Sequence, residues 1–295
     1  MGKLCVAVVG ATGMVGREML RVLEERAFPV RELRPLASAR SAGTKLPFGG
    51  AEHEVQEISE AAFQGVDVAL FSAGAGPSKT WSPIAAAAGA LVVDNSSAFR
   101  MDPEVPLVVP EVNLDAASDR PKGIIANPNC STIQMVVALK PLHDAAGLTR
   151  VVVSTYQAIS GSGASAVEAF DGQCKALVAG TEIDTSAFGG QLAGNVLMHW
   201  KRDVASGYQE EELKMVFESR KILGLPDLRV SPTAVRVPVA SGHSESLAIE
   251  FQKPLSPAEA RALLEKAEGV TVVDDFAAGV YPTPPDCVVK HAVYV

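Results

Sequence analysis

The first candidate for chemistry is a cysteine at the start of an expected helix. Cys130 lies in the run NPNCST, residues 127–132, directly before residues whose periodicity predicts a helix as far as Ala146. The positive end of a helix dipole lowers the pKa of a thiol and favours the thiolate, which is the nucleophilic form. Spacing alone leaves open that Cys130 is a small core residue, as we expect for Cys5 and Cys287, which lie in or near apolar runs.

A thiolate nucleophile works with a group that accepts and returns a proton, and the chain has five histidines. His243 lies on a glycine-containing loop after a predicted strand, where catalytic groups are often displayed. No histidine belongs to an H-E-x-x-H pair or another recognisable ligand set, which argues against metal catalysis. The other histidines fall in helical or strand-edge patterns: His53, His143, His199 and His291.

A glycine-rich segment near the start of the chain predicts a dinucleotide site. The run GATGMVG, residues 10–16, follows a predicted strand over residues 4–9 and opens a predicted helix over residues 14–25. Glycines let backbone N–H groups approach a pyrophosphate, and a helix N-terminus stabilises its negative charge. The alternative is a tight turn that binds no ligand.

The end of the second predicted strand bears on which dinucleotide binds. An NAD site usually carries Asp or Glu there, whereas this chain has Arg40 and Ser41, which could hold a 2′-phosphate. The pattern therefore favours NADP. The alternative is that Arg40 is a solvated loop residue.

The predicted helices and strands that position these residues follow different patterns in the first and second parts of the chain. Aliphatic runs at 4–9, 32–38, 66–72, 90–94 and 124–126 alternate with helical patterns, which predicts a doubly wound parallel sheet of Rossmann type in an α/β domain. Runs at 151–157, 234–239, 246–251 and 270–273, with helices at 131–146, 210–223 and 256–267, predict an α+β domain with a mixed sheet. We expect two domains, 1–127 and 128–295. The apolar face of the first helix is expected to hold Val15, Met19, Val22 and Leu23.

Composition narrows the class of protein. The 295 residues include 26 Lys and Arg against 34 Asp and Glu, for a net charge of −8, which disfavours nucleic acid and anionic membranes as partners. Four widely spaced cysteines without a C-x-x-C pair argue against a zinc ribbon and a secreted disulfide framework. The N-terminal residues show no signal-peptide pattern, and no apolar run approaches the ~18 residues of a membrane span. We therefore expect a cytoplasmic protein.

Taken together, these segments resemble the aspartate-semialdehyde dehydrogenase family of bacterial type. The resemblance spans nearly the whole chain and rests on ordered motifs at family-like spacing. They are GATGMVG (10–16), DNSSAFRM (94–101), VPEVN (109–113), NPNCST (127–132), STYQAISGSG (154–163), EELKM (211–215) and RVPVASGHSE (236–245). On this resemblance, Cys130 and His243 are expected to be the catalytic pair.

The resemblance implies a phosphorylating aldehyde dehydrogenase that acts through a cysteine thioester. Cys130 would attack aspartate 4-semialdehyde, a hydride would pass to NADP, and inorganic phosphate would displace the thiol to give 4-aspartyl phosphate. Biosynthesis of lysine, threonine, methionine and diaminopimelate would run the reverse reaction with NADPH. His243 matches the general acid/base, and Gln157 matches the residue that orients the substrate beside the cysteine.

The resemblance also implies a local cationic pocket in an acidic chain. Arg236 matches an arginine that grips the substrate carboxylate with two hydrogen bonds. Arg100 and Lys214 match the residues that hold phosphate, although Lys214 could belong to a solvated helix face. Glu211 is a candidate partner for the substrate ammonium, with Glu210 and Glu212 beside it. The other implied contacts are Asn129 for substrate and Gly10, Thr12, Gly13, Met14, Val15, Arg40, Ser41, Ser160 and Gly161 for the cofactor.

The resemblance further implies a homodimer formed largely through the second domain. Family members usually continue for a few dozen residues beyond the strand expected at residues 291–295, in a helical tail that returns to the dinucleotide domain. We expect a version of the chain that carries this tail to bind NADP more tightly and to be more stable.

Four other classes of protein are alternatives to be weighed against the same motifs. The nearest is N-acetyl-glutamyl-phosphate reductase, whose cysteine usually lies in a P-G-C-Y context that differs from the one at Cys130. A glyceraldehyde-phosphate dehydrogenase would have Thr-Thr-Asn after its cysteine, and a non-catalytic NADP sensor would not need both Cys130 and His243. A short-chain reductase would need Tyr-x-x-x-Lys, which the tyrosines at 156, 208 and 281 do not provide.

Overall fold

The computed structural model describes residues 2–198 and 200–295, so His199 lies outside the described residues. The chain divides into two compact units. The first runs to Val108 and includes Asn113–Pro128, and the second comprises Val109–Val112 and Asn129–Val295.

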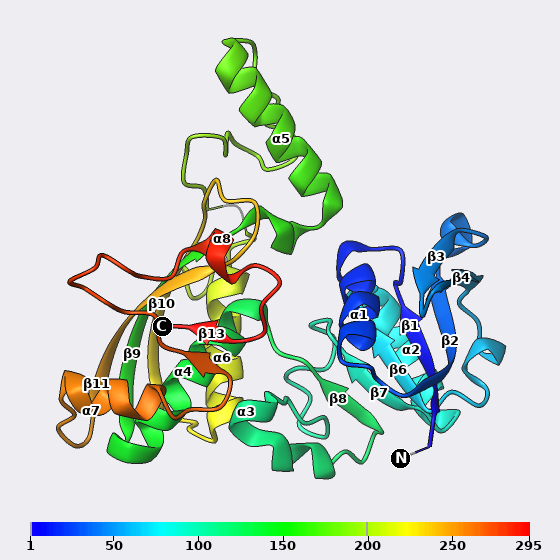
Figure 1. The fold of residues 1–295 in the computed structure, drawn as a ribbon, viewed down its shortest axis with the longest axis horizontal. Coiled ribbons are helices and arrows are strands. Elements are labelled where there is room, and N and C mark those ends of the chain that lie inside the picture. The colour runs from blue at the N-terminus through cyan, green and yellow to red at the C-terminus, as the bar shows by residue number, and fades with distance from the viewer. Residues whose placement is uncertain (1, 199) are drawn as a thin grey trace. The chain divides into compact units, whose positions relative to one another are not determined.

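The first unit is built on a six-stranded parallel sheet (Figure 1). Its strands, β1 (Leu4–Val9), β2 (Val30–Ala37), β5 (Gln56–Glu57), β6 (Val68–Phe71), β7 (Leu91–Asp94) and β8 (Ile124–Ala126), lie in the order β5-β2-β1-β6-β7-β8. All neighbouring pairs are parallel. Numbered along the chain, this order is 3-2-1-4-5-6, the order of doubly wound dinucleotide-binding folds. The predicted fold class is confirmed, and the order in which successive strands are added to the sheet reverses between β1 and β6.

Helix α1 (Met14–Glu25) has the predicted bounds but not the predicted buried face. Val15 is 44% exposed, whereas Gly16 and Leu20, four residues apart, are buried. Residues at this spacing lie above one another on a helix, so this pair determines which side packs inward. The prediction for Val15 was therefore wrong, and Met19, Val22 and Leu23 are half-buried.

Helix α2 (Ala75–Ala87) is the other long helix of this unit. A hairpin of β3 (Lys45–Phe48) and β4 (Ala51–Glu54) was not predicted. Its turn residues, Gly49 and Gly50, have φ values of 62° and 77°. Two consecutive residues with positive φ make a type I′ turn, so the Gly-Gly pair was an available signal.

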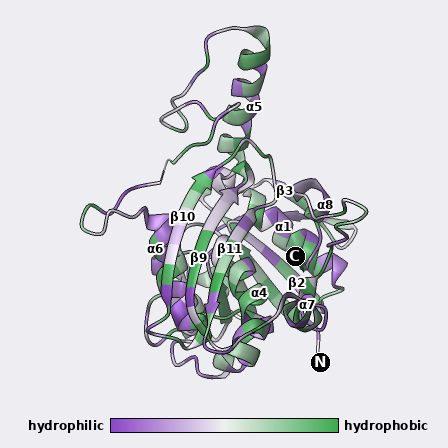
Figure 2. Ribbon diagram, turned by 90° about the vertical axis from the view of Figure 1, so that its left-hand side faces the viewer, coloured by the Kyte–Doolittle hydropathy of each residue, from purple (hydrophilic) through white to green (hydrophobic). Residues whose placement is uncertain are grey.

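The second unit contains the predicted mixed sheet. Strand β9 (Leu148–Gln157) lies between β10 (Arg229–Arg236), which is parallel to it, and β11 (Ser244–Phe251), which is antiparallel. Figure 2 shows the three strands side by side. Helix α4 (Cys130–Ala146) packs on β9 and β11, and α6 (Glu210–Leu223) packs on β10 and on α4.

Several bounds in the second unit differ from the prediction. The strand predicted at 234–239 is β10, which pairs with β9 from Arg229 to Arg236 and then leaves the sheet before Pro238. Helix α7 (Pro257–Leu264) starts after the capping box of Ser256 and Glu259, as predicted for a helix from residue 256, but it ends three residues before the predicted end at 267. Helices α5 (Ala164–Ala179) and α8 (Pro284–Cys287) were not predicted, and α8 places Cys287 in a helix instead of an apolar strand run.

The remaining elements are short. Strand β12 (Val270–Thr271) pairs in parallel with β13 (Val293–Tyr294) in a separate sheet. Single turns are α3 (Pro110–Asn113), η1 (Ala39–Ser41), η2 (Ala61–Phe63), η3 (Leu114–Ser118) and η4 (Ile159–Ser162). Among the described residues, no helix has both the length and the apolar character needed to span a membrane.

Candidate active site

Cys130 is the first residue of α4 and its side chain is exposed. Asn129 is the N-cap of this helix, and its Oδ1 accepts a hydrogen bond from the backbone N of Ser131 at 3.0 Å. Such a cap satisfies one of the N–H groups that a helix start leaves without a partner. The predicted location of the cysteine at a helix start is confirmed.

His243 lies on the loop between β10 and β11, as predicted, and reaches the cysteine. Its Nε2 is 3.3 Å from Cys130 Sγ, although 113 residues separate the two in the chain. The backbone N–H of Ala158 donates to Nδ1 of the same ring at 2.9 Å. Because Nδ1 accepts this bond, the proton of the neutral imidazole is on Nε2 and faces the sulfur.

The charge state of His243 follows from its surroundings. Burial lowers its pKa, the positive charge of Arg236 lowers it further, and Glu211 opposes both, with a result of about 4 against an ordinary 6.5. The ring is therefore neutral near pH 7.

Glu211 is a buried carboxylate that joins three of the predicted substrate residues. Its Oε1 accepts from Asn129 Nδ2 at 2.9 Å and from Gln157 Nε2 at 3.0 Å. Its Oε2 accepts from Lys214 Nζ at 2.8 Å. Burial alone would raise the pKa of Glu211, but the charge of Lys214 and these hydrogen bonds hold it below its usual value. The carboxylate therefore stays ionised.

Arg236 ends β10 and is buried. Its Nη1 donates to the carbonyl oxygen of Ala158, and its guanidinium carbon lies 4.6 Å from the ring centroid of Trp200. Burial lowers the pKa of Arg236, while Glu211 and Cys130 raise it. Within the described chain, its buried Nε has no hydrogen-bond partner. Ala158 thus contacts both functional side chains, since its N–H reaches His243 and its C=O reaches Arg236.

Ser160 and Gly161 lie in the turn η4, directly after β9. The backbone N of Ser160 donates to the carbonyl oxygen of Ala240 at 3.0 Å. A Cβ added to Gly161 would lie 3.4 Å from the His243 ring and 3.5 Å from Arg236 Nη1. Glycine therefore brings the main chain close to both side chains.

The glycine turn of the first unit lies between β1 and α1, as predicted. Gly10 has φ +84°, and a Cβ there would lie 2.5 Å from the carbonyl oxygen of Ser72. A Cβ on Gly16 would lie 2.2 Å from the carbonyl oxygen of Gly10. Both positions require glycine because the atoms they approach are main chain. Gly13 is the N-cap of α1, and Met14 and Val15 are exposed in its first turn.

Arg40 and Ser41 form part of η1, immediately after β2. Thr12 Oγ1 donates to Ser41 Oγ at 3.5 Å, which places Ser41 beside the glycine turn. Arg40 is exposed on the same turn. Both residues were predicted to follow the second strand, and this position is confirmed.

Arg100 belongs to the first unit and is buried there. Its Nε donates to the carbonyl oxygen of Asn127 at 2.9 Å, and its Nη2 donates to that of Asn95 at 3.0 Å. Arg100 therefore supports the segment that leads, three residues later, to Cys130.

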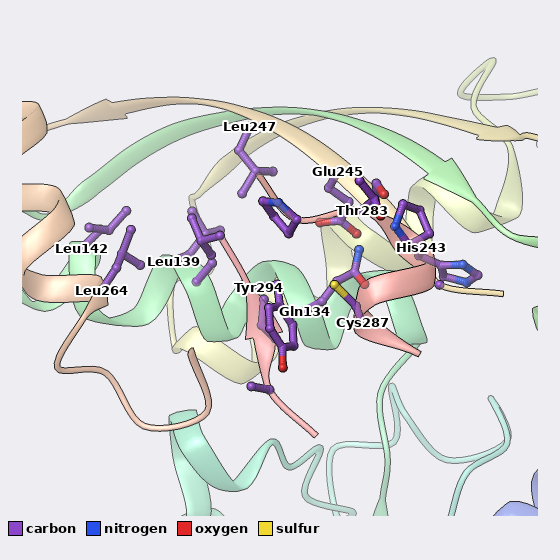
Figure 3. Close-up of a pocket in the computed structure, with 18 of the residues that line it drawn as sticks. Gln134, Leu139, Leu142, His243, Glu245, Leu247, Leu264, Thr283, Cys287 and Tyr294 are labelled. Atoms are coloured by element: carbon purple, nitrogen blue, oxygen red, sulfur yellow. The ribbon is translucent and has the colours of Figure 1, made fainter. Parts of the chain in front are cut away.

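A cavity of about 650 Å³ lies beside His243 within the second unit (Figure 3). Leu139, Leu142, Leu247 and Leu264 line one end, and Gln134, Glu245, His243 and Thr283 line the other. Burial raises the pKa of Glu245 to about 8, against the opposing hydrogen bond from Gln134. This carboxyl group is therefore mostly protonated near pH 7. Across residues 2–198 and 200–295, no group of three His, Cys, Asp or Glu side chains could hold a metal ion.

One carboxylate in contact with the cysteine segment was not predicted from the sequence. Glu218 of α6 is 1% exposed, and its Oε2 accepts from the backbone N of Asn129 at 2.6 Å. Residues 211, 215, 218 and 222 follow helical spacing and are all buried. An acidic residue at an apolar position of this stripe was the signal that could have identified it.

Comparison with known proteins gives consistent matches for both units. A family model described as semialdehyde dehydrogenase, NAD binding domain, matches residues 5–120, and one described as semialdehyde dehydrogenase, dimerisation domain, matches residues 139–295. An aspartate-semialdehyde dehydrogenase of Aquifex aeolicus is 55% identical over 282 residues, which cover 95% of this chain and 83% of that protein. One from Bacillus subtilis is 48% identical over 304 residues, covering 100% and 88%.

Solved structures agree. The crystal structure of aspartate semialdehyde dehydrogenase II from Vibrio cholerae complexed with ASA has a TM-score of 0.93 at 44% identity. The match covers 96% of this chain and 84% of that one.

Proposed function

This chain belongs to the aspartate-semialdehyde dehydrogenase family, a group of oxidoreductases of aspartate-family amino-acid biosynthesis, and on that premise we propose that it reduces 4-aspartyl phosphate with NADPH through a thioester on Cys130. The observation that carries the proposal is the 3.3 Å approach of His243 Nε2 to Cys130 Sγ at the start of α4. The relatives and the solved structure bear the same activity name, so the N-acetyl-glutamyl-phosphate reductase alternative is not favoured.

Cys130 forms the covalent intermediate. Its thiolate attacks the acyl carbon of the substrate, the C–S bond forms, and the C–O bond to phosphate breaks, which leaves a thioester and inorganic phosphate. The nicotinamide cofactor supplies the hydride that reduces this thioester. The resulting oxyanion collapses, breaks the C–S bond and returns the thiolate with release of the aldehyde.

His243 stabilises negative charge at two successive atoms. Its Nε2–H donates to Sγ and so favours the thiolate before attack. When charge moves to the carbonyl oxygen, the same N–H can donate to that oxygen. The bond from Ala158 to Nδ1 keeps the proton on Nε2, so the geometry supports the acid half of the predicted acid/base role.

The substrate groups are assigned to residues whose charges match them. Arg236 binds the substrate carboxylate. Its buried Nε has no hydrogen-bond partner among the described residues, so this N–H can donate to the carboxylate. Lys214 and Arg100 bind phosphate, Glu211 meets the ammonium, and Gln157 and Asn129 orient the substrate through their shared contact with Glu211. Arg236 and Lys214, which both lie in the second unit, provide positive charge for an anionic substrate in a chain of net charge −8.

The cofactor is proposed to be NADP(H), without a metal. The backbone of Gly10, Thr12 and Gly13 and the first turn of α1 at Met14 and Val15 fit a pyrophosphate, since Gly10 and Gly16 allow the close main-chain packing of this turn. Ser41 beside Thr12, with Arg40 exposed next to it, fits a 2′-phosphate. The main chain of Ser160 and Gly161 is proposed to contact the nicotinamide half.

The assembly is proposed to be a cytoplasmic homodimer. The dimerisation-domain model over residues 139–295 supports oligomerisation through the second unit.

The test is NADP reduction driven by aspartate semialdehyde and inorganic phosphate. We expect Cys130→Ala to lose at least about 10³-fold in kcat, because the variant lacks the sulfur that forms the thioester. Activity that survives in Cys130→Ala, or that needs neither phosphate nor arsenate, would contradict the mechanism.

A further inference from the structure

A buried carboxylate outside the predicted site contacts the main chain beside the cysteine. Glu218 Oε2 accepts the backbone N–H of Asn129 at 2.6 Å, and only 1% of Glu218 is exposed. Burying a carboxylate is costly unless its hydrogen bonds repay the lost hydration. The helix start that it touches is positive, which offsets part of this cost.

Glu211 and Glu218 hold Asn129 between them. The two residues are seven positions apart in α6, so they share one face and lie about 10.5 Å apart along the axis. Glu211 accepts from the side chain of Asn129 at 2.9 Å, and Glu218 accepts from its main chain at 2.6 Å. The third polar group of Asn129, Oδ1, accepts from Ser131 N at 3.0 Å. Its carbonyl oxygen accepts from Ile133 N at 2.9 Å, so the residue directly before Cys130 is fixed at four points.

The two carboxylates bear differently on the cysteine. Glu211 is paired with the cation Lys214, and its contacts with Asn129 and Gln157 explain its place in the substrate site. Glu218 accepts from the main chain of Asn129, so this contact acts on Cys130 through the backbone. When ionised, the Glu218 carboxylate opposes formation of the thiolate, whereas the helix start, Arg236 and the Nε2–H of His243 favour it.

We propose that Glu218 is a positioning residue for the nucleophile: by accepting the Asn129 N–H, it fixes the main chain at the entrance of α4 and thereby the place of Cys130 Sγ. This inference rests on the proposed function, in which Cys130 is the nucleophile. Misplacement of a reacting atom by about 1 Å can cost about 100-fold in rate.

The experiment compares Glu218→Ala, which removes the acceptor, with Glu218→Gln, which keeps an acceptor oxygen and removes the charge. We expect Glu218→Ala to lower kcat by about 10- to 100-fold with KM changed less than about threefold, and Glu218→Gln to restore most of kcat. Iodoacetamide labelling of Cys130, followed by peptide mass mapping across pH, adds a second readout. The midpoint of labelling is the pH at which Cys130 reacts at half its maximal rate. This midpoint should move to lower pH in both variants, because a negative charge near the thiolate is lost.

Glu212→Gln is the matched control. Glu212 is also buried in α6, but it accepts from Gln209 and from Ala234 N, away from the cysteine segment. We expect its labelling midpoint to match that of the parent protein and its kcat to change less than about twofold.

Two results would overturn the inference. One is a folded Glu218→Ala variant with parental kcat and labelling midpoint. The other is an equal midpoint shift in Glu212→Gln, which would show a general effect of buried charge. If Glu218→Ala does not fold, Glu218→Asp decides, because its shorter side chain keeps the carboxylate but withdraws the acceptor from Asn129 N. Its kcat should fall, and a folded Glu218→Asp variant with the parental kcat would overturn the inference. Cys130→Ala, measured in parallel, distinguishes failure of this inference from failure of the proposed function. If Cys130→Ala stays active, the proposed function itself is wrong.

Discussion

In the first unit, the candidate cofactor site is made by seven consecutive residues, 10–16, and a short turn after the next strand. In the second unit, the candidate reaction site draws on the start of α4, the end of β9, one face of α6, the end of β10 and the loop before β11. The glycine turn works through main-chain atoms and the absence of side chains. The cysteine site works through side chains such as Cys130 and His243, which meet across 113 residues of sequence.

This difference predicts two modes of failure. A site made by close main-chain approach fails when a side-chain atom is added, because moving the backbone away from that atom costs much free energy. A site made by converging side chains fails when a partner is removed, because a buried polar group is then left unsatisfied. The following predictions test this distinction, in order of decreasing effect.

The largest effect is expected from Gly16→Ala. The new Cβ would lie 2.2 Å from the carbonyl oxygen of Gly10, and relief requires α1 to move away from the turn. We expect a loss of at least about 3 kcal/mol in the free energy of unfolding and loss of NADPH binding. Urea denaturation and NADPH fluorescence titration measure the two effects. Gly76→Ala in α2, where nothing lies within 4 Å of the added atom, is the control and should be neutral or stabilising. Parental stability in Gly16→Ala would contradict the packing argument.

A smaller effect is expected at Glu245, beside His243. Because its pKa is about 8 in the folded protein and ordinarily 4.5, the folded state keeps a proton that the unfolded state loses between these pH values. The contribution to stability is present below pH 4.5 and decreases as the pH rises to about 8, by up to about 1.4 kcal/mol per pH unit.

Glu245→Gln should remove this decrease. The free energy of unfolding of the variant should therefore rise relative to that of the parent protein between pH 5 and pH 7. Chemical denaturation at each pH measures the difference. Glu250→Gln, on the exposed side of the same strand, should leave the slope unchanged. A parental slope in Glu245→Gln would show that this carboxyl group is ionised in the folded protein.

The smallest effect is expected from Arg40→Ala. Arg40 is exposed, so its charge-assisted bonds to a 2′-phosphate compete with water. We expect the KM for NADPH to rise about tenfold, with the KM for NADH unchanged. Steady-state kinetics with both cofactors give the comparison, and Lys45→Ala, another exposed cation of this unit, is the control. Equal changes for NADPH and NADH would argue against a 2′-phosphate contact.

Much of the fold was predictable because its signals are local. The bounds of β1, α1 and α6 match the predicted ones, since aliphatic runs, helical periodicity and capping residues act within a few turns of chain. The start of β10 was predicted five residues too late, because the strand begins where its pairing with β9 begins. Helix α5 has no strong periodic pattern and was missed.

The sequence by itself determined that a glycine turn opens the first helix, that Cys130 starts a helix and that His243 lies on a loop. Each of these depends on residue types in one short window. Only the tertiary structure decided which histidine nitrogen faces the sulfur, that Glu211 joins Asn129, Gln157 and Lys214, and that Glu218 holds the main chain before the cysteine. These contacts depend on how distant elements pack, and packing direction is not contained in the periodicity of any single element.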